Sequence, residues 1–490
     1  MAYLVESLRN IILENQELIG KRSYYPRMMK VERISGKATI ITGIRRCGKT
    51  VYENLYAGKL IENGVDRRNI CIIDFSDDRL TEMRTTEPDS IIEAYYGLFP
   101  EKSSEKVYYF FDEIQYLNNW ELFINRLQNT RNCEINITGS SAKLLVREIA
   151  TEFGGRGLSW ELFPFSFREF LETKEDKDTF NDVRTMTADT GRLCYKYFKE
   201  YEHKGGFPES LAIIEDDTRI RYLQNLAETV IFRDVIRRYN ITNPDGGYRL
   251  MQLLLGEMSG LMTFTKQKKR LDGEQYRLSV EMIKDITGYL EEAYLIFTVE
   301  IFSLNVAARK TNPKKVYCVD HSVALVMSGS LTLDKGKILE NIVFMHLRRS
   351  TDRIFYAKTS GGYEIDFAVL SRGQRLSENS VPELIQVSAD IDNADTLNRE
   401  VRALSEGMAE YGTKKSILIT ENTEDRIETE AGVINVLPAW KYLLIEDNLL
   451  FDSTDAPWAT LKASIGTIPD DFMKDREQPG WDEVNEREDM

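Results

Sequence analysis

The stretch Gly43-Ile44-Arg45-Arg46-Cys47-Gly48-Lys49-Thr50 decides the fold of this chain. One glycine stands four variable residues ahead of Gly-Lys-Thr, between a predicted strand at 39–42 and a helix that begins near Lys49. The glycines let the backbone curl so that successive N–H groups point inward at phosphate oxygens, and the helix adds its positive N-terminal end. The pattern predicts a phosphate-binding loop made of Gly43, Ile44, Arg45, Arg46, Cys47, Gly48, Lys49, Thr50 and Val51.

The chemistry of such a loop assigns roles to its last residues and to a second pattern. Lys49 is expected to reach the β- and γ-phosphates of ATP, and the Thr50 hydroxyl is expected to hold Mg²⁺. A buried strand at 107–111 ends in Asp112-Glu113, and the carboxyl ends of strands are where α/β sheets bind their ligands. We expect Asp112 to bind Mg²⁺ and Glu113 to activate the attacking water as a general base.

A third polar position follows the strand predicted at 134–138. That strand leads into Gly139-Ser140-Ser141, which brings hydroxyl groups to the same edge of the sheet. Ser140 is expected to contact the γ-phosphate or the attacking water, and we count it as catalytic together with Lys49 and Glu113. The alternative is an ordinary strand-to-helix turn with a serine cap.

Around these motifs, residues 39–165 alternate between short apolar strands and helices. This alternation is typical of an α/β fold with a parallel sheet and helices on both faces. The strands are apolar on both faces, as buried parallel strands are. They are predicted at 39–42, 69–75, 107–111, 134–138 and 158–162.

The rest of the chain divides into five further segments. A helical lead-in occupies 1–38, an all-helical lid 166–240, a winged-helix-like domain 241–310, a strand-rich α/β domain 311–445 and an acidic tail 446–490. In the α/β domain, strands are predicted at 315–319, 354–357, 364–370, 384–387, 416–420 and 433–437.

Several runs of sequence together resemble the prokaryotic AAA+-type ATPases that are fused to a C-terminal domain of unknown function. The resemblance implies an AAA+ fold with Walker A at 43–50, Walker B at 112–113 and a sensor-1 residue at Ser140 or Ser141. It makes Arg156 the candidate finger or sensor arginine, the alternative being a surface arginine. Arg45 and Arg46 would flank the nucleotide without a catalytic role. The runs that carry the resemblance are GIRRCGKT, YYFFDEIQ, NITGSSAKLL, GGRGLSWELFPFSFREFL, GGFPES, KVYCVDHSVA, GKILENIVFMHLRR and GGYEIDFAVL.

The C-terminal domain of that family resembles restriction-endonuclease-like nucleases, in which two acids bind a metal and a lysine assists the attacking water. Here the corresponding positions are Glu340, Asp366, Gln386 and Ser388. Gln386 in place of a glutamate removes one negative charge, and Ser388 in place of a lysine removes the cation. The resemblance therefore implies a retained fold that holds DNA or a protein, and an inactive nuclease site.

Composition limits the setting in which the chain works. The net charge of −15 argues against a protein coated in nucleic acid. The basic run at 266–270 is interpreted either as a local patch for DNA or as a solvated loop. Five widely spaced cysteines without a CxxC pair are typical of free thiols, and no apolar run is long enough for a membrane span. We expect a cytoplasmic protein without a membrane partner. Three histidines without ligand spacing argue against a zinc site.

These patterns favour an Mg²⁺-dependent ATPase that acts as a motor or switch coupled to DNA or protein binding. A nucleotide-sensing DNA-binding module with little turnover and an ATP-gated nuclease are the alternatives. A homo-oligomer stays open, because a finger arginine is often supplied by a neighbouring copy. The tail has nine acids against three bases over 466–490, and is interpreted as a disordered end or as a short segment that folds on a protein partner.

Overall fold

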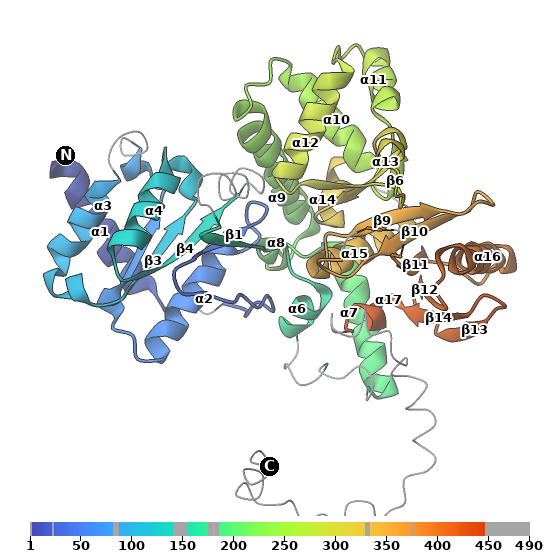
Figure 1. Ribbon diagram of the computed structural model, residues 1–490, viewed down its shortest axis with the longest axis horizontal. Helices are drawn as coiled ribbons and strands as arrows, with labels where there is room; N and C mark the ends of the chain where they lie inside the picture. Colours follow the sequence, from blue (N-terminus) through green and yellow to red (C-terminus); the bar gives the residue numbers. More distant parts are fainter. Residues whose placement is uncertain are drawn as a thin grey trace, which may run out of the picture. The chain divides into compact units, whose positions relative to one another are not determined.

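Figure 1 shows the computed structural model of the chain, which describes residues 2–21, 24–81, 88–140, 155–174, 180, 186–328, 334–374, 376–377 and 379–445. Residues 1–444 form one compact unit. Ser141 and the predicted tail at 446–490 lie outside the described residues. Within the described residues, no helix is at once long enough and apolar enough to cross a membrane.

The first sheet contains the five strands predicted around the phosphate-binding loop. They lie in the order β2-β3-β4-β1-β5, and every neighbouring pair is parallel, which confirms the predicted α/β fold. The order places the ends of β1, β4 and β3 side by side, so the loop and the polar strand ends meet at one edge. The strands are β1 (Ala38–Thr42), β2 (Ile70–Asp74), β3 (Val107–Asp112), β4 (Cys133–Gly139) and β5 (Gly157–Glu161).

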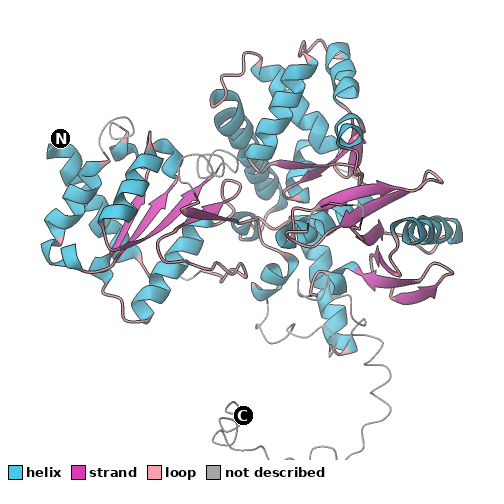
Figure 2. Cartoon of the chain, in the orientation of Figure 1, coloured by secondary structure: helices cyan, strands magenta, loops and turns pink. Residues whose placement is uncertain are grey.

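Helices cover both faces of this sheet, as Figure 2 shows. Tyr109 and Phe111 belong to the core under α1, α3 and α4, whereas Phe110 packs with α2 on the opposite face. Successive side chains of a strand point to opposite faces, so an apolar run such as that of β3 supports a core on each side. The helices and short 3-10 turns are α1 (Ala2–Leu18), α2 (Lys49–Glu62), η1 (Arg67–Asn69), η2 (Asp78–Leu80), α3 (Asp89–Leu98), η4 (Pro100–Ser104), η5 (Ile114–Tyr116) and α4 (Trp120–Thr130).

The described residues of the segment that follows form helices joined by short loops, as the sequence predicts. It begins with a capping box, in which the Ser166 hydroxyl accepts from the Glu169 N–H while the Glu169 carboxylate accepts from the Ser166 N–H. Its last helix passes without a break into η7, where the backbone winds as a π-helix. The elements are α6 (Phe167–Glu172), α7 (Ala188–Lys204), α8 (Pro208–Leu211), α9 (Asp216–Thr229) and η7 (Val230–Arg237).

Five helices and a small antiparallel sheet come next among the described residues, and the sheet extends across one predicted domain boundary. The sheet has the order β6-β8-β7, so the strand expected to open the last domain pairs with strands from 241–310. A boundary at 310 would cut this sheet, because β8 is its buried central strand. The winged-helix interpretation of this segment stays a prediction. The elements are α10 (Pro244–Gly256), β6 (Gly260–Met262), α11 (Phe264–Gly273), α12 (Val280–Glu292), β7 (Ile296–Val299), α13 (Val306–Thr311), β8 (Lys314–Cys318) and α14 (His321–Met327).

The last sheet has six strands in the order β13-β14-β12-β11-β10-β9. Five of them match predicted strands, and α16 packs against β10, β11 and β12. The sixth, β13, was missed because three of its four residues are charged and exposed, which leaves no apolar alternation to detect. The elements are α15 (Lys335–Ser350), β9 (Ile354–Lys358), β10 (Glu364–Val369), β11 (Glu383–Ser388), α16 (Ala394–Tyr411), β12 (Lys415–Thr420), β13 (Asp425–Glu428), β14 (Val433–Pro438) and α17 (Ala439–Tyr442).

Candidate functional site

The loop between β1 and α2 has the backbone of a phosphate cradle. Gly43 has a φ of 153°, and a Cβ atom there would lie 2.1 Å from the carbonyl oxygen of Leu162. Gly48, with a φ of 100°, is the residue that directly precedes α2, and Arg46 between them also has a positive φ of 64°. Glycine at 43 is therefore required by the close approach of β5 to the loop, and at 48 by its left-handed conformation.

Lys49 is buried at the centre of this loop. Its Nζ donates to the carbonyl oxygens of Gly43 (3.0 Å) and Ile44 (3.1 Å), and it lies 3.9 Å from Oε1 of Glu113. An ammonium group held by carbonyl oxygens of its own loop is available to phosphate oxygens that enter the same space. The structure thus brings Lys49 and Glu113 together, as the sequence predicts.

Asp112 and Thr50 offer the oxygen atoms of a magnesium site. The Thr50 hydroxyl donates to Oδ2 of Asp112 at 2.5 Å, and the Thr138 hydroxyl donates to Oδ1. Burial raises the pKa of Asp112 to about 6 and the charge of Glu113 adds to this, against the hydrogen bonds from Thr138 and Thr50. A buried carboxylate that forms no ion pair with a described residue and lies beside a hydroxyl fits Mg²⁺, which prefers oxygen ligands.

Glu113 follows directly and has the left-handed backbone angles φ 52° and ψ 47°. A non-glycine residue in this region is held there by its surroundings. Its N–H donates to the Thr138 hydroxyl (3.1 Å), and Gln115 Nε2 donates both to its carboxylate and to the Ser140 hydroxyl (3.3 Å). Burial alone would raise the pKa of Glu113, but the charges of Lys49 and Arg45 and hydrogen bonds outweigh it and lower that pKa.

Two polar residues of this cluster were not predicted. Thr138 is the residue that ties the ends of β3 and β4 together, and Gln115 links Glu113 to Ser140. Both stand within three residues of a predicted position, so the signal that could have found them is their place at the carboxyl ends of neighbouring strands. Ser140 is buried and meets Glu113 through Gln115.

Arg156 lies where the strands begin, at the opposite end of the sheet from the phosphate-binding loop. β5 pairs with β1 from Gly157 opposite Ala38 to Glu161 opposite Thr42, so Arg156 stands where these strands begin and the loop stands where β1 ends. The separation is a strand length, roughly 16 Å for five residues. The Arg156 guanidinium instead donates to Asn129 (3.0 Å). A role toward its own loop does not fit this position, and a role toward a neighbouring copy stays a prediction.

Arg27, which no motif singles out, holds the loop from outside. Its guanidinium donates to the carbonyl oxygens of Cys47 (2.8 Å) and Phe163 (2.6 Å) and to the Glu169 carboxylate (2.8 Å). The Arg27 and Glu169 side chains are only 2% and 4% exposed. Burial would raise the pKa of Glu169, but the charges of Arg27 and Arg349 lower it to about 2. This pair ties the lead-in, the loop and α6 together.

The two loop arginines reach the helical segment that follows the sheet. Arg45 donates from Nε and NH2 to the two carboxylate oxygens of Asp234, at 3.1 and 3.0 Å. Arg46 pairs with Glu209 at 2.5 Å, where both side chains are about half exposed. The loop is therefore in direct contact with α8 and η7.

The four positions of the nuclease-like pattern lie together in the last domain, around a lysine that the sequence did not indicate. Glu340, Asp366, Gln386 and Ser388 all line one pocket of about 720 Å³. Lys315 of β8 contacts two of them, with its Nζ 3.0 Å from Glu340 and 2.7 Å from Asp366. The same Nζ lies 2.9 Å from a further acid, Glu364. Its distance in sequence from these acids, and its place in another sheet, explain why it was missed.

The acids of this pocket are already satisfied by protein groups. Asp366 accepts hydrogen bonds from Lys315 and from the Val387 N–H. The side-chain amide of Gln386 accepts from the Asp366 N–H and donates to the Glu400 carboxylate. Burial and the charge of Asp366 raise the pKa of Glu340 to about 8. Among the described residues, no group of three or more acids, histidines or cysteines is arranged to hold a metal.

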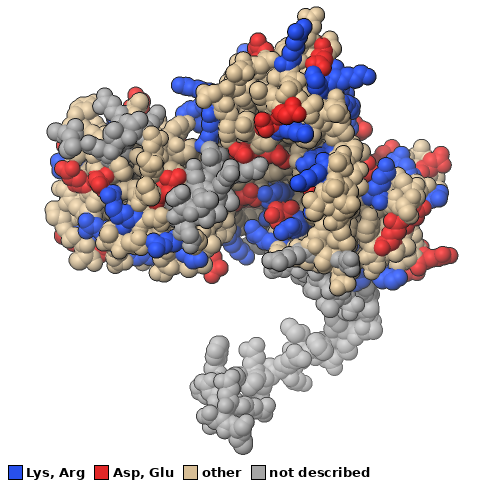
Figure 3. Space-filling model, turned by 45° about the horizontal axis from the view of Figure 1, so that its top comes forward, with Lys and Arg blue, Asp and Glu red and all other residues tan. Residues whose placement is uncertain are grey.

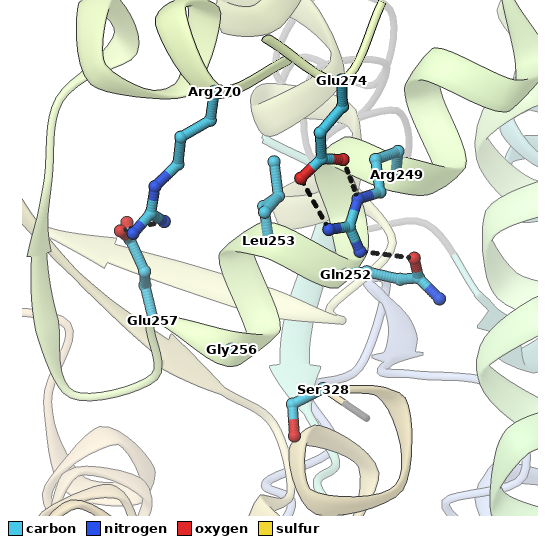
Figure 4. Close-up of a pocket in the computed structure, with 8 residues that line it drawn as sticks. All are labelled: Arg249, Gln252, Leu253, Gly256, Glu257, Arg270, Glu274 and Ser328. Carbon is cyan, nitrogen blue, oxygen red and sulfur yellow. Dashed lines mark hydrogen bonds and ion pairs between the residues drawn. The ribbon is translucent and has the colours of Figure 1, made fainter. Parts of the chain in front are cut away.

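A second pocket, of about 410 Å³, lies between α10 and α11 (Figure 4). Arg249 and Glu274 pair at 2.5 Å on one side of it, and Arg270 and Glu257 pair at 2.5 Å on the other. Lys266 also pairs with Glu257 at 2.9 Å. Lys268 pairs with Asp272 at 2.8 Å, so three of the four bases at 266–270 pair with acids of their own segment.

The parallel sheet, the glycine-rich loop with Lys49 and the acids at the end of β3 define the nucleotide-binding core of an AAA-type P-loop protein. A family model described as an AAA domain matches residues 35–171, and a model described as a domain of unknown function (DUF8612) matches 195–334. The fold and family of the core thus agree with the expectation drawn from the sequence motifs.

The chain belongs to the same family as the uncharacterized protein MJ1544 of Methanocaldococcus jannaschii. The two are 30% identical over 444 residues, which cover 89% of this chain and 94% of that protein. An uncharacterized protein of Haemophilus influenzae is 25% identical and covers 77% of this chain and 90% of its own length. Among solved structures, the Walker-type ATPase of Pyrococcus abyssi matches 59% of this chain and 90% of its own, at 16% identity and a TM-score of 0.36.

Proposed function

We propose that this protein is an Mg²⁺-dependent ATPase whose nucleotide state controls the domains that follow the AAA core. The observation that carries the proposal is the convergence of Lys49, the Thr50–Asp112 pair and Glu113 at one edge of the parallel sheet. Each is the residue type that phosphoryl transfer requires at that place.

The reaction transfers the γ-phosphoryl group of ATP to water. The water oxygen forms a bond to the γ-phosphorus, the bond to the oxygen that bridges to the β-phosphorus breaks, and ADP and phosphate leave. Glu113, kept ionised by neighbouring cations, accepts the proton of the water. Lys49 offsets negative charge on the β- and γ-oxygens. Mg²⁺ held by Thr50 and Asp112 would supply further charge neutralisation.

Contacts between the core and the later domains support a switch. The Thr42 hydroxyl, at the end of β1, is hydrogen-bonded to the buried Tyr294 hydroxyl at 2.7 Å. Arg348 of α15 pairs with Glu161 at the end of β5 at 2.7 Å. Both contacts join a strand of the nucleotide-binding sheet to a downstream domain, so a shift at the loop has a physical route outward.

The charge distribution favours a protein over DNA as the partner of the downstream domains. Figure 3 shows acidic and basic side chains interspersed over the face that it draws. Helix α12 carries four acids, Glu281, Asp285, Glu291 and Glu292, against one base, Lys284. An acidic helix repels phosphates, whereas phosphate contacts dominate DNA affinity. A salt titration with duplex DNA tests this: tight binding that weakens steeply with salt would contradict it.

We further propose that the last domain is a nuclease-like fold without nuclease activity. Lys315 forms ion pairs with both Glu340 and Asp366 from within the protein, which weakens their attraction for a metal ion. Plasmid DNA incubated with Mn²⁺ should be cleaved no faster by the wild-type protein than by the Asp366→Ala variant. Cleavage by the wild type alone would restore the ATP-gated nuclease as a function.

The ATPase proposal is tested by the Glu113→Gln variant. Glutamine keeps the size of Glu113 but cannot take the proton, so ATP should bind and turnover should fall by at least ~100-fold. Phosphate release is measured with and without Mg²⁺, next to a Glu121→Gln control in the first turn of α4. Equal, slow turnover by the wild type and Glu113→Gln would sink the proposal and leave a nucleotide-sensing module.

A further inference from the structure

The contact between Arg45 and Asp234 joins the phosphate-binding loop to the π-helix η7. The guanidinium and the carboxylate meet through two parallel hydrogen bonds of 3.1 and 3.0 Å, and their side chains are 15% and 8% exposed. A bidentate pair of this kind fixes both the position and the plane of the arginine. Arg45 is thus held by a group that lies far away in the sequence.

The same π-helix also contacts the turn that follows Glu113. Arg233 donates to the Tyr116 hydroxyl at 2.5 Å, and its guanidinium lies 5.4 Å from the centre of the Tyr116 ring. Tyr116 ends η5, the short turn that begins directly after Glu113. Neighbouring residues of η7 therefore reach both sides of the reaction site, and π-helical turns are frequent at functional sites.

Arg45 belongs to the part of the loop that lies near Glu113. Its partner Asp234 directly follows Arg233, which contacts Tyr116 in the turn after Glu113, and Lys49 of the same loop lies 3.9 Å from Glu113. Arg46, the next residue, turns outward to Glu209 and is 52% exposed. Arg156, the arginine expected to serve the reaction, lies at the opposite edge of the sheet. Of these three arginines, Arg45 is the one whose ion pair adjoins the residue that contacts the turn after Glu113.

We propose that Arg45 is a catalytic arginine supplied by the loop itself, and that Asp234 is the positioning residue that holds it beside Glu113. This inference rests on the proposed ATPase function and adds to it a residue that stabilises charge on the γ-phosphate oxygens. The site is then completed within one chain. It is active only while η7 is docked on the loop, which makes the helical segment a condition for turnover.

The chemistry is the hydrolysis described above, with the proton passing to Glu113 and ADP as the leaving group. A fixed guanidinium stabilises charge that grows on the γ-phosphate oxygens, and loss of such a donor costs on the order of 100-fold or more in rate. Asp234 touches neither water nor phosphate in this account. Its loss should lower the rate constant by leaving Arg45 free to move, with little effect on nucleotide affinity.

The test compares kcat, KM and the Kd of a fluorescent ATP analogue in full-length variants. Arg45→Gln should lower kcat by about 100-fold, and Asp234→Asn by about 10-fold or more with KM within about 3-fold of wild type. Asp234→Glu should recover part of the loss. Asp216→Asn is the matched control, because it breaks an aspartate–arginine pair of 3.0 Å on the preceding helix α9. Thermal unfolding of every variant reports on folding.

Each result decides the question. If Arg45→Gln turns over within about 3-fold of wild type while Glu113→Gln is inactive, the inference fails and the ATPase function stands. If Asp216→Asn loses as much kcat as Asp234→Asn, or if Asp234→Glu recovers nothing, Asp234 has only a structural role and the inference fails. If kcat per chain rises steeply with protein concentration, an arginine from a neighbouring copy completes the site. Absence of turnover by the wild type overturns both proposals.

Discussion

At the scale of single residues, the loop depends on Gly43, where the neighbouring backbone leaves no room for a side chain. A Cβ atom on Gly43 would lie 2.1 Å from the Leu162 carbonyl oxygen, whereas one on Gly58 of α2 would meet nothing within 4 Å. Gly43→Ala should therefore weaken ATP binding at least 10-fold, by about 1.4 kcal/mol. Gly58→Ala should stabilise the protein by about 0.5–1 kcal/mol. Calorimetric titration and chemical unfolding measure the two, and unchanged ATP binding by Gly43→Ala would contradict the account.

Lys315 is the residue on which the last domain depends. Removing it leaves the buried carboxylates of Glu340 and Asp366 without their lysine partner, and breaking a buried pair in this way costs about 3–5 kcal/mol. Lys315→Met should lower the unfolding free energy by that amount in urea, while Met at the exposed Lys310 should change it by less than about 0.5 kcal/mol. A loss of less than about 1 kcal/mol of unfolding free energy in Lys315→Met would contradict this role.

At the scale of elements, the Arg27–Glu169 pair joins the lead-in, the loop and α6, and it gives a pH dependence. The pKa of Glu169 is about 2 in the folded protein, below its ordinary value. The stability it contributes is therefore complete above the unfolded pKa of about 4.3, and is lost as the pH falls toward the folded pKa. By linkage this amounts to at most about 3 kcal/mol.

Chemical unfolding at pH 6 and at pH 3 measures this contribution. The wild-type protein should lose more stability than Glu169→Gln over that interval, because the variant has no proton to bind at this site. Glu421→Gln is the control, since its carboxylate pairs with Lys199 at 3.0 Å but is far more exposed. Equal acid sensitivity of the wild type and Glu169→Gln would remove the pair from the account.

The elements of the first sheet were predictable because their strands are short, apolar on both faces and set off by polar turns. Each of the five predicted strands matches an observed one to within a residue at either end. What the sequence could not provide were contacts between distant segments. Arg27 to Cys47, Arg45 to Asp234 and Lys315 to Asp366 leave no local pattern, since each depends on the tertiary fold.

At the scale of the whole molecule, the account makes nucleotide occupancy and the downstream domains interdependent. If nucleotide binding favours one arrangement of η7, that arrangement must by linkage favour nucleotide binding to the same extent. Hydrogen exchange should show that a non-hydrolysable ATP analogue protects amides of η7 and β7 in addition to the loop. Tyr294→Phe, which removes the hydroxyl bonded to Thr42, should reduce the protection in β7 and keep it in the loop. Protection confined to the loop would contradict a switch.

The central claim is that this chain hydrolyses the ATP that its loop binds, and the nucleotide retained by the protein tests it most directly. Wild-type protein and Glu113→Gln are incubated with ATP and Mg²⁺, filtered rapidly, and the bound nucleotide is identified. The account predicts ADP on the wild-type protein and intact ATP on the variant, near one molecule per chain in each case. Intact ATP on both proteins would show that the chain senses nucleotide without hydrolysing it, and would contradict the account.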